Sequence, residues 1–343
     1  MLKIIADSAI PFLEGVLDSW AEVRRLPGAV ITAADVRDAD ALIIRTRTRC
    51  NAALLDGSRV GFIATATIGF DHIDLEYCRR RGIGVATAAG CNARGVLQWV
   101  GAVLHYLSRE QGWSPAERTL GVVGVGHVGS LVSEYARRWG FRVVCCDPPR
   151  EERERLGFLP LEQVAEQADL LTFHTPLDAS TRGMGSAALL ARMKPGAVVM
   201  NSSRGEVVDG QALLESGHPF VLDVWEHEPD IAPALLDRAL LATPHIAGYT
   251  EQGKANATAA AVAAVARAFR LPLEGWYPPS VTPSRPRPIS WEELGRTIRD
   301  AFDIEAESRY LKGHRGEFEQ LRDHYPSVSY THLRAHETSQ DLV

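Results

Sequence analysis

A glycine-rich turn between an apolar run and a helical run constrains this sequence more than any other feature. The run Thr119–Val125 is typical of a buried strand, and a helical pattern follows as far as Trp139. In a Gly-x-Gly-x-x-Gly turn the first glycine permits a tight bend, the second lets the backbone approach a pyrophosphate, and the third lets helix and strand pack closely. The sequence therefore predicts a dinucleotide-binding turn. Its predicted contacts are Gly124, Gly126, His127, Val128 and Gly129.

An acidic residue at the end of the next strand bears on which dinucleotide binds. The apolar run Phe141–Cys146 is followed by Asp147, close to the spacing of about 20 residues expected for the group that binds the adenosine ribose. A carboxylate there accepts hydrogen bonds from the ribose diol and repels a 2′-phosphate, which favours NAD over NADP. Arg150 leaves the alternative open, because a nearby guanidinium can accommodate the extra phosphate.

Short apolar runs alternate with helical patterns along most of the chain. Such alternation predicts an α/β protein in which parallel sheets carry helices on both faces. We expect two doubly wound, Rossmann-like domains. The helices expected most clearly are Asp74–Arg81 and Ala93–Gln111. The expected strands are Leu2–Ala6, Ala41–Arg45, Val60–Thr65 and Ile83–Ala86 in the first domain, and Thr119–Val125, Arg142–Cys146, Leu170–His174, Ala197–Asn201 and Phe220–Val224 in the second.

The C-terminal third predicts how the domains are bounded. The alanine-rich run Ala255–Phe269 should form a helix that returns to the first domain, and the proline-rich segment Pro272–Pro288 should be a linker. Ser290 with Glu293 then fits a capping box that starts a helix to Phe302. The expected domains are a flavodoxin-like substrate domain (1–92 and 255–282), a dinucleotide domain (93–254) and a small, truncated α+β domain (283–327).

The last residues predict no function. Residues 328–338 read VSYTHLRAHET, which matches one reading frame of a common sequencing adaptor. We therefore expect 328–343 to be a non-native tail, with a genuine polar tail as the alternative.

Charge and cysteine content exclude several classes of protein. The net charge of -6 provides no global basic field for nucleic acid. Neither a signal sequence nor a run of about 18 apolar residues is found, so we expect a cytoplasmic protein that does not bind membranes. Cys50, Cys78, Cys91, Cys145 and Cys146 have irregular spacing and no Cys-x-x-Cys pair, which indicates reduced thiols and no metal site.

Three later segments place polar residues at strand ends, where ligands bind in a doubly wound sheet. His245 is a candidate base, because imidazole titrates near physiological pH, and Glu228 could orient it. Arg204 could hold a carboxylate with its guanidinium fork. These types suit hydride removal from a 2-hydroxy acid, although each alone could be structural or solvated. His174 is a rival base, but with Thr175 it should line the nucleotide pocket.

These segments together resemble the D-isomer-specific 2-hydroxyacid dehydrogenase family, in which a catalytic Arg, Glu and His follow the glycine-rich turn in this order. The resemblance covers roughly residues 2–326 and assigns these roles to Arg204, Glu228 and His245. Further matching strings are Thr65–Asp74, Gly90–Ala93, Cys146–Arg150, Phe173–Leu177, Pro244–Thr250 and Gly316–Arg322. The resemblance implies NAD contacts from Asp147, Thr175, Ser202, Ser203, Asp223 and Gly248, and substrate contacts from Thr46, Thr67 and Tyr249.

A phosphorylated substrate would suit the loop that begins at Arg45. Guanidinium and hydroxyl groups alternate in Arg45–Arg49, and such donors can hold a phosphate dianion. The alternative is a solvated basic loop for the flanking arginines, and Arg45 and Thr46 are favoured over Arg49 as substrate contacts. The segment Leu214–Val221 is shorter than the family pattern, which could shift Asp223 or only trim a surface loop.

The resemblance implies oxidation of 4-phospho-D-erythronate by NAD to the corresponding 2-oxo acid, a step toward pyridoxal phosphate. It also implies a homodimer when the C-terminal domain is intact. Two alternatives stay open. The substrate could be another 2-hydroxy acid such as 3-phosphoglycerate, or the chain could be a non-catalytic NAD-sensing protein on the same scaffold.

Overall fold

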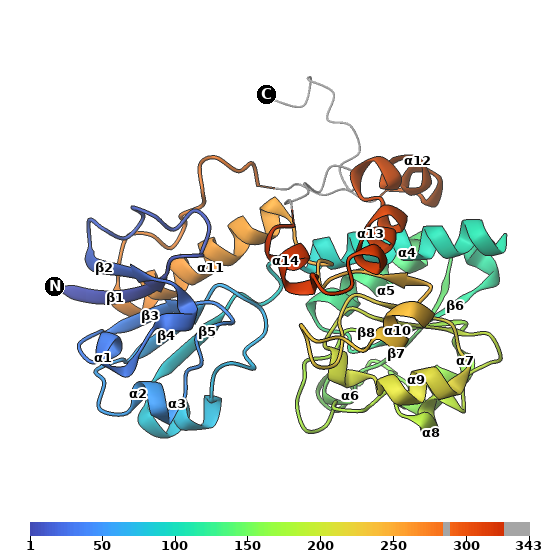
Figure 1. Cartoon of the computed structure of the whole chain (residues 1–343), viewed down its shortest axis with the longest axis horizontal. Helices are drawn as coiled ribbons and strands as arrows, with labels where there is room; N and C mark the ends of the chain where they lie inside the picture. Colours follow the sequence, from blue (N-terminus) through green and yellow to red (C-terminus); the bar gives the residue numbers. More distant parts are fainter. Residues whose placement is uncertain (284–288, 326–343) are drawn as a thin grey trace. The chain divides into compact units, whose positions relative to one another are not determined.

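The computed structural model describes residues 1–283 and 289–325. Within these ranges the chain forms two compact units, which are drawn in Figure 1. Unit 1 contains Met1–Asn92 and Glu251–Pro283, and unit 2 contains Ala93–Thr250 and the described residues after 288. The α/β class with two parallel sheets is confirmed. The expected tail at 328–343 lies outside the described residues, as do the last residues of the expected linker.

Unit 1 is a five-stranded parallel sheet with the order β2-β1-β3-β4-β5, which is the flavodoxin-like order. Ile4 and Ile43 lie on one face, while Ile5 and Leu42 lie on the other, because strand side chains alternate. The strands are β1 (Leu2–Asp7), β2 (Ala21–Leu26), β3 (Ala41–Ile44), β4 (Phe62–Thr65) and β5 (Gly84–Thr87).

Helix α11 (Glu251–Phe269) covers one face of the unit 1 sheet, although it follows unit 2 in the sequence. Its side chains are small, so the helix approaches the sheet closely, and Thr258 Oγ1 donates to the carbonyl of Pro11 at 2.8 Å. The helix begins four residues earlier than the alanine-rich run predicts, since Glu251 already belongs to its first turn. The opposite face carries α1 (Ala33–Val36), α2 (Ala52–Leu55) and α3 (Leu75–Arg81).

Two strands were not predicted from the sequence. Strand β2 is an edge strand whose residues 21–26 include Glu22, Arg24 and Arg25, so it contains no apolar run. It forms by pairing in register with β1, from Leu2 opposite Ala21 onward. Strand β11 (Leu241–Ala242) has only two residues. Both owe their structure to a neighbouring strand rather than to their own pattern.

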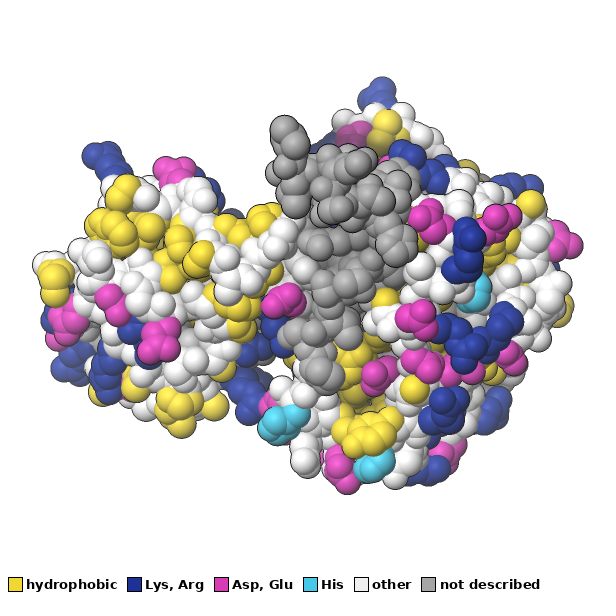
Figure 2. Space-filling view, turned by 90° about the horizontal axis from the view of Figure 1, so that it is seen from above, with side chains coloured by type: hydrophobic (Ala, Val, Ile, Leu, Met, Phe, Trp, Pro, Cys, Tyr) yellow, Lys and Arg dark blue, Asp and Glu magenta, His cyan; other side chains and the backbone are white. Residues whose placement is uncertain are grey.

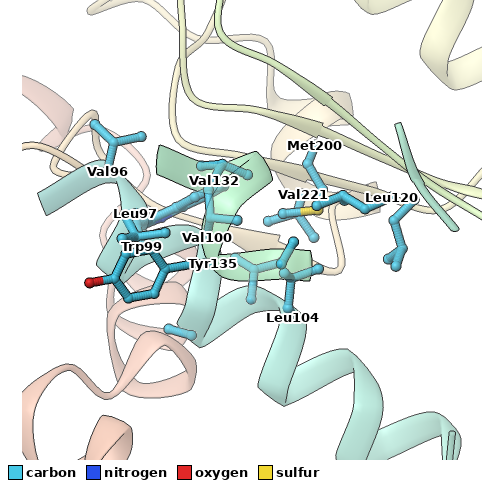
Figure 3. Close-up of a cluster of buried hydrophobic side chains, with 14 of the residues drawn as sticks. Val96, Leu97, Trp99, Val100, Leu104, Leu120, Val132, Tyr135, Met200 and Val221 are labelled. Carbon is cyan, nitrogen blue, oxygen red and sulfur yellow. The ribbon is translucent and has the colours of Figure 1, made fainter. Parts of the chain in front are cut away.

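Unit 2 is a six-stranded parallel sheet with the order β11-β10-β9-β8-β6-β7. Helices α4 (Ala93–Gln111) and α5 (His127–Trp139) cover one face, where Trp99 and Val132 meet strand residues such as Leu120, Met200 and Val221 (Figure 3). The strands are β6 (Thr119–Val123), β7 (Arg142–Cys146), β8 (Leu170–Phe173), β9 (Val198–Asn201), β10 (Phe220–Leu222) and β11.

The second face of this sheet is covered by shorter helices. Phe173 and Val199 point to this face, one residue out of phase with the set that meets α4 and α5. The helices of unit 2 that follow α5 in the sequence before Thr250 are α6 (Pro148–Glu154), α7 (Leu161–Gln167), α8 (Ala187–Leu190), α9 (Gly210–Ser216) and α10 (Pro233–Arg238). Both sheets are thus buried on two faces, which is the doubly wound arrangement.

The described residues 289–325 are helical and join unit 2. Ser290 caps the first of these helices as predicted, since its Oγ accepts from the Glu293 amide at 3.1 Å. Trp139 Nε1 donates to the carbonyl of Ile289, and Ser308 Oγ accepts from Ala242 N beside β11. The helices are α12 (Trp291–Ala301), α13 (Ile304–Gly313) and α14 (Phe318–Asp323). No strand occurs among the described residues of this expected α+β segment, and these residues pack onto unit 2 instead of forming a third compact unit.

Surface charge in unit 2 is mixed. On the face drawn in Figure 2, Lys and Arg side chains lie among Asp and Glu side chains without a continuous field of one sign. Among the helices of the described ranges, none is both long and apolar enough to cross a membrane.

Candidate active site

The glycine-rich turn has the geometry that each of its glycines predicts. Gly124 has a φ of +83°, which only glycine adopts readily. A Cβ on Gly129 would lie 1.9 Å from the carbonyl oxygen of Gly124, so α5 could not approach β6 with any other residue there. A Cβ on Gly126 would meet nothing within 4 Å. The turn therefore leaves open space at the N-terminus of α5, where backbone N–H groups and the helix dipole favour a pyrophosphate.

Asp147 is the N-cap residue of α6 and stabilises the same turn through hydrogen bonds. Its Oδ2 accepts from Val125 N at 2.7 Å, and its Oδ1 accepts from Arg150 N at 3.0 Å. Arg150 is held by Glu154 through two hydrogen bonds of 2.9 and 2.6 Å and also donates to the carbonyl of Val125. The guanidinium that could have received a 2′-phosphate is thus already paired with a carboxylate, which favours NAD.

The segment after β8 adjoins the turn. A Cβ on Gly124 would lie 2.8 Å from the carbonyl oxygen of His174 and 2.8 Å from Thr175 Cγ2, so the two loops pack together. Burial lowers the pKa of His174 to about 3, and its Nε2 lies 3.1 Å from Thr172 Oγ1. His174 is therefore neutral at physiological pH and is a poor rival to His245 as a proton acceptor.

Two buried hydroxyls beside these strands are unpaired in the part of the chain that the structure describes. Thr175 Oγ1 after β8 and Ser202 Oγ after β9 have no hydrogen-bond partner among the described residues. Buried polar atoms are rarely left unpaired, so each is suited to a bound ligand. Ser203 differs, because its Oγ donates to Asn201 Oδ1 at 2.7 Å and stabilises the local turn. The open turn and the two unpaired hydroxyls fit a dinucleotide along the carboxyl ends of β6, β8 and β9.

Arg204 lies after β9, next to the loop that follows β10. Its Nη1 donates to the carbonyl of Ser203 at 2.7 Å, and its own carbonyl accepts from Asn201 Nδ2. The next residue, Gly205, allows this placement: a Cβ there would lie 2.0 Å from the carbonyl carbon of Trp225. The Arg204 loop and the loop containing Glu228 are therefore in direct backbone contact.

Glu228 and His245 form a hydrogen-bonded pair. His245 Nδ1 lies 2.7 Å from Glu228 Oε2, and their side chains are 24% and 16% exposed. The other oxygen, Oε1, accepts from the backbone N–H of Trp225 at 2.9 Å. Burial works to raise the pKa of Glu228, but the charge and hydrogen bond of His245, with further help from Arg322, hold it below its usual value. Glu228 is thus an ionised carboxylate aimed at one nitrogen of the imidazole.

Asp223 anchors the loop that presents His245. Its buried carboxylate accepts from Thr243 Oγ1 at 2.6 Å and from the amides of Ile246 and Ala247, while its carbonyl accepts from His245 N. His245 itself has a φ of +57°, an uncommon conformation for a non-glycine residue that these bonds hold in place. The short segment before β10 leaves Asp223 directly after that strand. The observed contacts are structural, and its contact with NAD stays a prediction.

The residues expected to hold substrate follow two adjacent strands of unit 1. Arg45 and Thr46 come directly after β3, and Arg45 Nη1 donates to the carbonyl of Ala9. Thr67 follows β4, and its Oγ1 lies 2.5 Å from Thr65 Oγ1. Lys254 on α11 was not predicted: burial, and then the charge of nearby Arg45, lower its pKa. The charges of Arg45 and Lys254 influence each other, and a pair of cations of this kind suits an anion such as phosphate.

Arg322 is a second residue that sequence reasoning missed. Its Nη1 lies 3.4 Å from Glu228 Oε2, and it also hydrogen-bonds with Tyr249. It ends the string Gly316–Arg322 that carries part of the family resemblance, but that string assigns it no role and does not place it beside Glu228, 94 residues away in the sequence. In the described ranges, no three His, Cys, Asp or Glu side chains are grouped as a metal site requires, and all five cysteines are free thiols.

Comparison with known proteins agrees with this geometry. The family model for the NAD binding domain of the D-isomer specific 2-hydroxyacid dehydrogenases matches residues 96–247. An erythronate-4-phosphate dehydrogenase of Bacteroides fragilis is 46% identical over 95% of this chain and 96% of its own length. One from Ectopseudomonas mendocina is 44% identical over 95% of this chain and 92% of its own length.

Solved structures show the same fold at lower identity. The NAD⁺-bound 3-phosphoglycerate dehydrogenase of Entamoeba histolytica matches with a TM-score of 0.67 and 24% identity, over 79% of this chain and 97% of that one. The D-lactate dehydrogenase of Aquifex aeolicus, solved with NAD and lactic acid, has a TM-score of 0.63 and 23% identity, over 82% and 100% of the two chains.

Proposed function

The chain belongs to the erythronate-4-phosphate dehydrogenases, within the D-isomer-specific 2-hydroxyacid dehydrogenase family, and from this premise we propose that it oxidises 4-phospho-D-erythronate to 3-hydroxy-2-oxo-4-phosphooxybutanoate. NAD is the cofactor, and the reaction is a step of pyridoxal phosphate biosynthesis. The observation that carries the proposal is the Glu228–His245 pair at the sheet edge, one loop away from Arg204.

The pair accounts for the proton that leaves the substrate. Because Nδ1 of His245 is held by Glu228, Nε2 is the nitrogen that takes the proton of the C2 hydroxyl. Glu228 then stabilises the imidazolium that forms. Arg204 holds the substrate carboxylate and orients C2, since a guanidinium binds a carboxylate through two parallel hydrogen bonds. When bound, NAD supplies the acceptor for the hydride from C2.

The chain's remaining site residues divide between cofactor and substrate. We assign the pyrophosphate to the turn at Gly124–Gly129 and the adenosine ribose to Asp147. Thr175, Ser202, Ser203, Asp223 and Gly248 are assigned to the rest of the cofactor. Substrate contacts are assigned to Arg45, Thr46, Thr67 and Tyr249, with the cations of unit 1 favouring a phosphorylated acid.

The two alternatives are less well supported. A non-catalytic NAD sensor would have no need of an ionised carboxylate directed at an imidazole in a conformation uncommon for histidine. A 3-phosphoglycerate dehydrogenase shares the fold with this chain, but the relatives of much higher identity carry a different name.

Assembly and location follow from the family as proposals. We propose a homodimer that works in the cytoplasm, where the five free thiols would stay reduced. We also propose that neither nucleic acid nor membrane is a partner. Light scattering on the purified protein and fractionation of cells test the first two points.

The proposed reaction is tested by following NADH absorbance with 4-phospho-D-erythronate, 3-phosphoglycerate and D-lactate. Hydrazine in the assay traps the 2-oxo product, so an unfavourable equilibrium does not hide turnover. We expect the highest kcat/KM with 4-phospho-D-erythronate. Turnover of another acid, with none of this one, would refute the assigned substrate.

A further inference from the structure

Arg322 joins the C-terminal helices to the proton-transfer pair. It lies on α14, and its Nη1 is 3.4 Å from Glu228 Oε2, the same oxygen that faces His245 Nδ1 at 2.7 Å. The longer distance makes this contact weaker than the one to His245. The Arg322 side chain is 27% exposed and that of Glu228 16%, so water screens their charges only in part.

The position of Arg322 is set by the packing of α14 on unit 2. Phe318 at the start of that helix is 2% exposed and joins the core on the second face of the sheet, with Leu321 against it. Lys312 Nζ donates to the carbonyl of Ala239, and Tyr325 OH donates to Glu307 Oε1. The guanidinium is therefore held at Glu228 by several independent contacts of its own segment.

The groups around this site are of both signs. Glu228 faces His245, Arg322 and the backbone of Trp225, while Asp223 interacts with both His245 and Arg322. Burial works to lower the pKa of Arg322, but Tyr249, Glu228 and Asp223 hold it above its usual value. Arg322 is thus a fixed positive charge, and it is one of the groups that keep Glu228 ionised.

We propose that Arg322 is a positioning residue for the reaction, which holds the Glu228 carboxylate ionised and aligned on His245. The segment 289–325 then contributes to proton transfer itself. The inference rests on the proposed function for its kinetic consequences, and its effect on Glu228 can be measured without turnover.

The test compares Arg322→Met, Arg322→Lys and the control Arg315→Met in the full chain. Arg315 pairs with Asp237 at 2.6 Å on the surface, so it also joins the C-terminal segment to unit 2, but its partner is Asp237 and not Glu228. In Arg322→Met we expect the acidic limb of the kcat/KM profile, which reports the coupled Glu228–His245 pair, to move up by roughly one pH unit, since removing a nearby cation favours the protonated forms of both groups. Arg322→Lys should restore most of the shift, and Arg315→Met should show none.

A second readout needs no substrate. In protein labelled at the glutamate carboxyl carbon, the Glu228 signal is assigned by its loss in Glu228→Gln. It should titrate at higher pH in Arg322→Met than in the unaltered protein. An unchanged Glu228 titration, or an equal change in Arg315→Met, would overturn the proposal. A raised KM with an unmoved acidic limb would overturn it as well and make Arg322 a substrate contact. If the unaltered chain does not oxidise 4-phospho-D-erythronate while the Glu228 titration still shifts, the substrate assignment fails and this inference stands.

Discussion

At the scale of single side chains, the proposed proton transfer depends on the partners of the two carboxylate oxygens of Glu228. Glu228 Oε1 accepts a hydrogen bond from the backbone N–H of Trp225, which fixes the orientation of the carboxylate. Its Oε2 faces His245 Nδ1. His174, the rival base, is instead held neutral by burial. Two histidines that follow strands β8 and β11 of one sheet are therefore proposed to have different roles because their surroundings differ.

His245→Gln tests that division of roles. We expect kcat to fall by about 10²- to 10⁴-fold, the usual contribution of a general base. The affinity for NADH, followed by fluorescence titration, should change little because the glycine-rich turn is untouched. His174→Gln is the matched control and should keep most of kcat. A loss in the control as large as in His245→Gln would make His174 the base.

Glu228→Gln tests the ionisation of the carboxylate. Because the folded pKa lies below the ordinary value of 4.5, ionised Glu228 stabilises the fold fully above that value, and this contribution is lost as the pH falls through the folded pKa. The difference in unfolding temperature between the unaltered protein and Glu228→Gln should therefore shrink between pH 5 and pH 3. A difference that stays constant over this range would mean that Glu228 is not held ionised by the fold.

At the scale of elements, the site is built from loops at the carboxyl ends of parallel strands. The loops after β6, β8, β9, β10 and β11 all contribute predicted residues, and the sheet order places them side by side. The segment from β6 through the turn to α5 has the most specific steric requirements. Gly129 is required for packing, and Gly126 leaves space for a ligand.

Gly129→Ala and Gly126→Ala should separate these two requirements. Gly129→Ala should lower the free energy of unfolding by about 1–3 kcal/mol or more, because its Cβ would overlap the carbonyl of Gly124. Gly126→Ala should cost less than about 1 kcal/mol, as a change at a helix N-cap. It should nevertheless weaken NADH binding at least tenfold, about 1.4 kcal/mol. Urea unfolding measures the change in the free energy of unfolding, and NADH titration measures the change in affinity. Normal NADH affinity in Gly126→Ala would place the pyrophosphate elsewhere.

At the scale of the whole molecule, each unit has its own two-faced sheet and its own cores. Unit 1 is completed by α11, which lies far along the chain from β1. Unit 2 is completed by the described residues 289–325. Both units are therefore assembled from segments that are distant in sequence. We expect each unit to unfold cooperatively as a whole.

Ile43→Ala tests the independence of the units. Ile43 is fully buried in β3, so its truncation should destabilise unit 1 by about 2–5 kcal/mol. NADH affinity should stay unchanged, since all the assigned cofactor contacts lie in unit 2. Leu222→Ala in β10 is the comparison and should destabilise unit 2 by a similar amount. Calorimetry with and without NADH distinguishes the unfolding of unit 1 in Ile43→Ala from that of unit 2 in Leu222→Ala. Weakened NADH binding in Ile43→Ala would show that cofactor binding also depends on unit 1.

The sequence by itself was sufficient for the α/β class, nine of the strands and the glycine-rich turn. These features are local. An apolar strand is recognised from its own residues, and Gly124 and Gly129 of the turn are required because neighbouring atoms leave no room for a Cβ or because φ is positive. The order of Arg204, Glu228 and His245 along the chain was likewise visible. It could suggest their roles through the family resemblance, but it carried no distances.

Only the tertiary structure decided what these side chains touch. Strand β2 forms because it pairs with β1. Packing brings Lys254 near the charge of Arg45, and it brings Arg322 near Glu228. The neutral state of His174 and the ionised state of Glu228 likewise depend on burial and on charges brought near by folding. Burial and charge interactions depend on distances in space and not on separation along the chain, so residues far apart in the sequence acquire them only when folding brings them together.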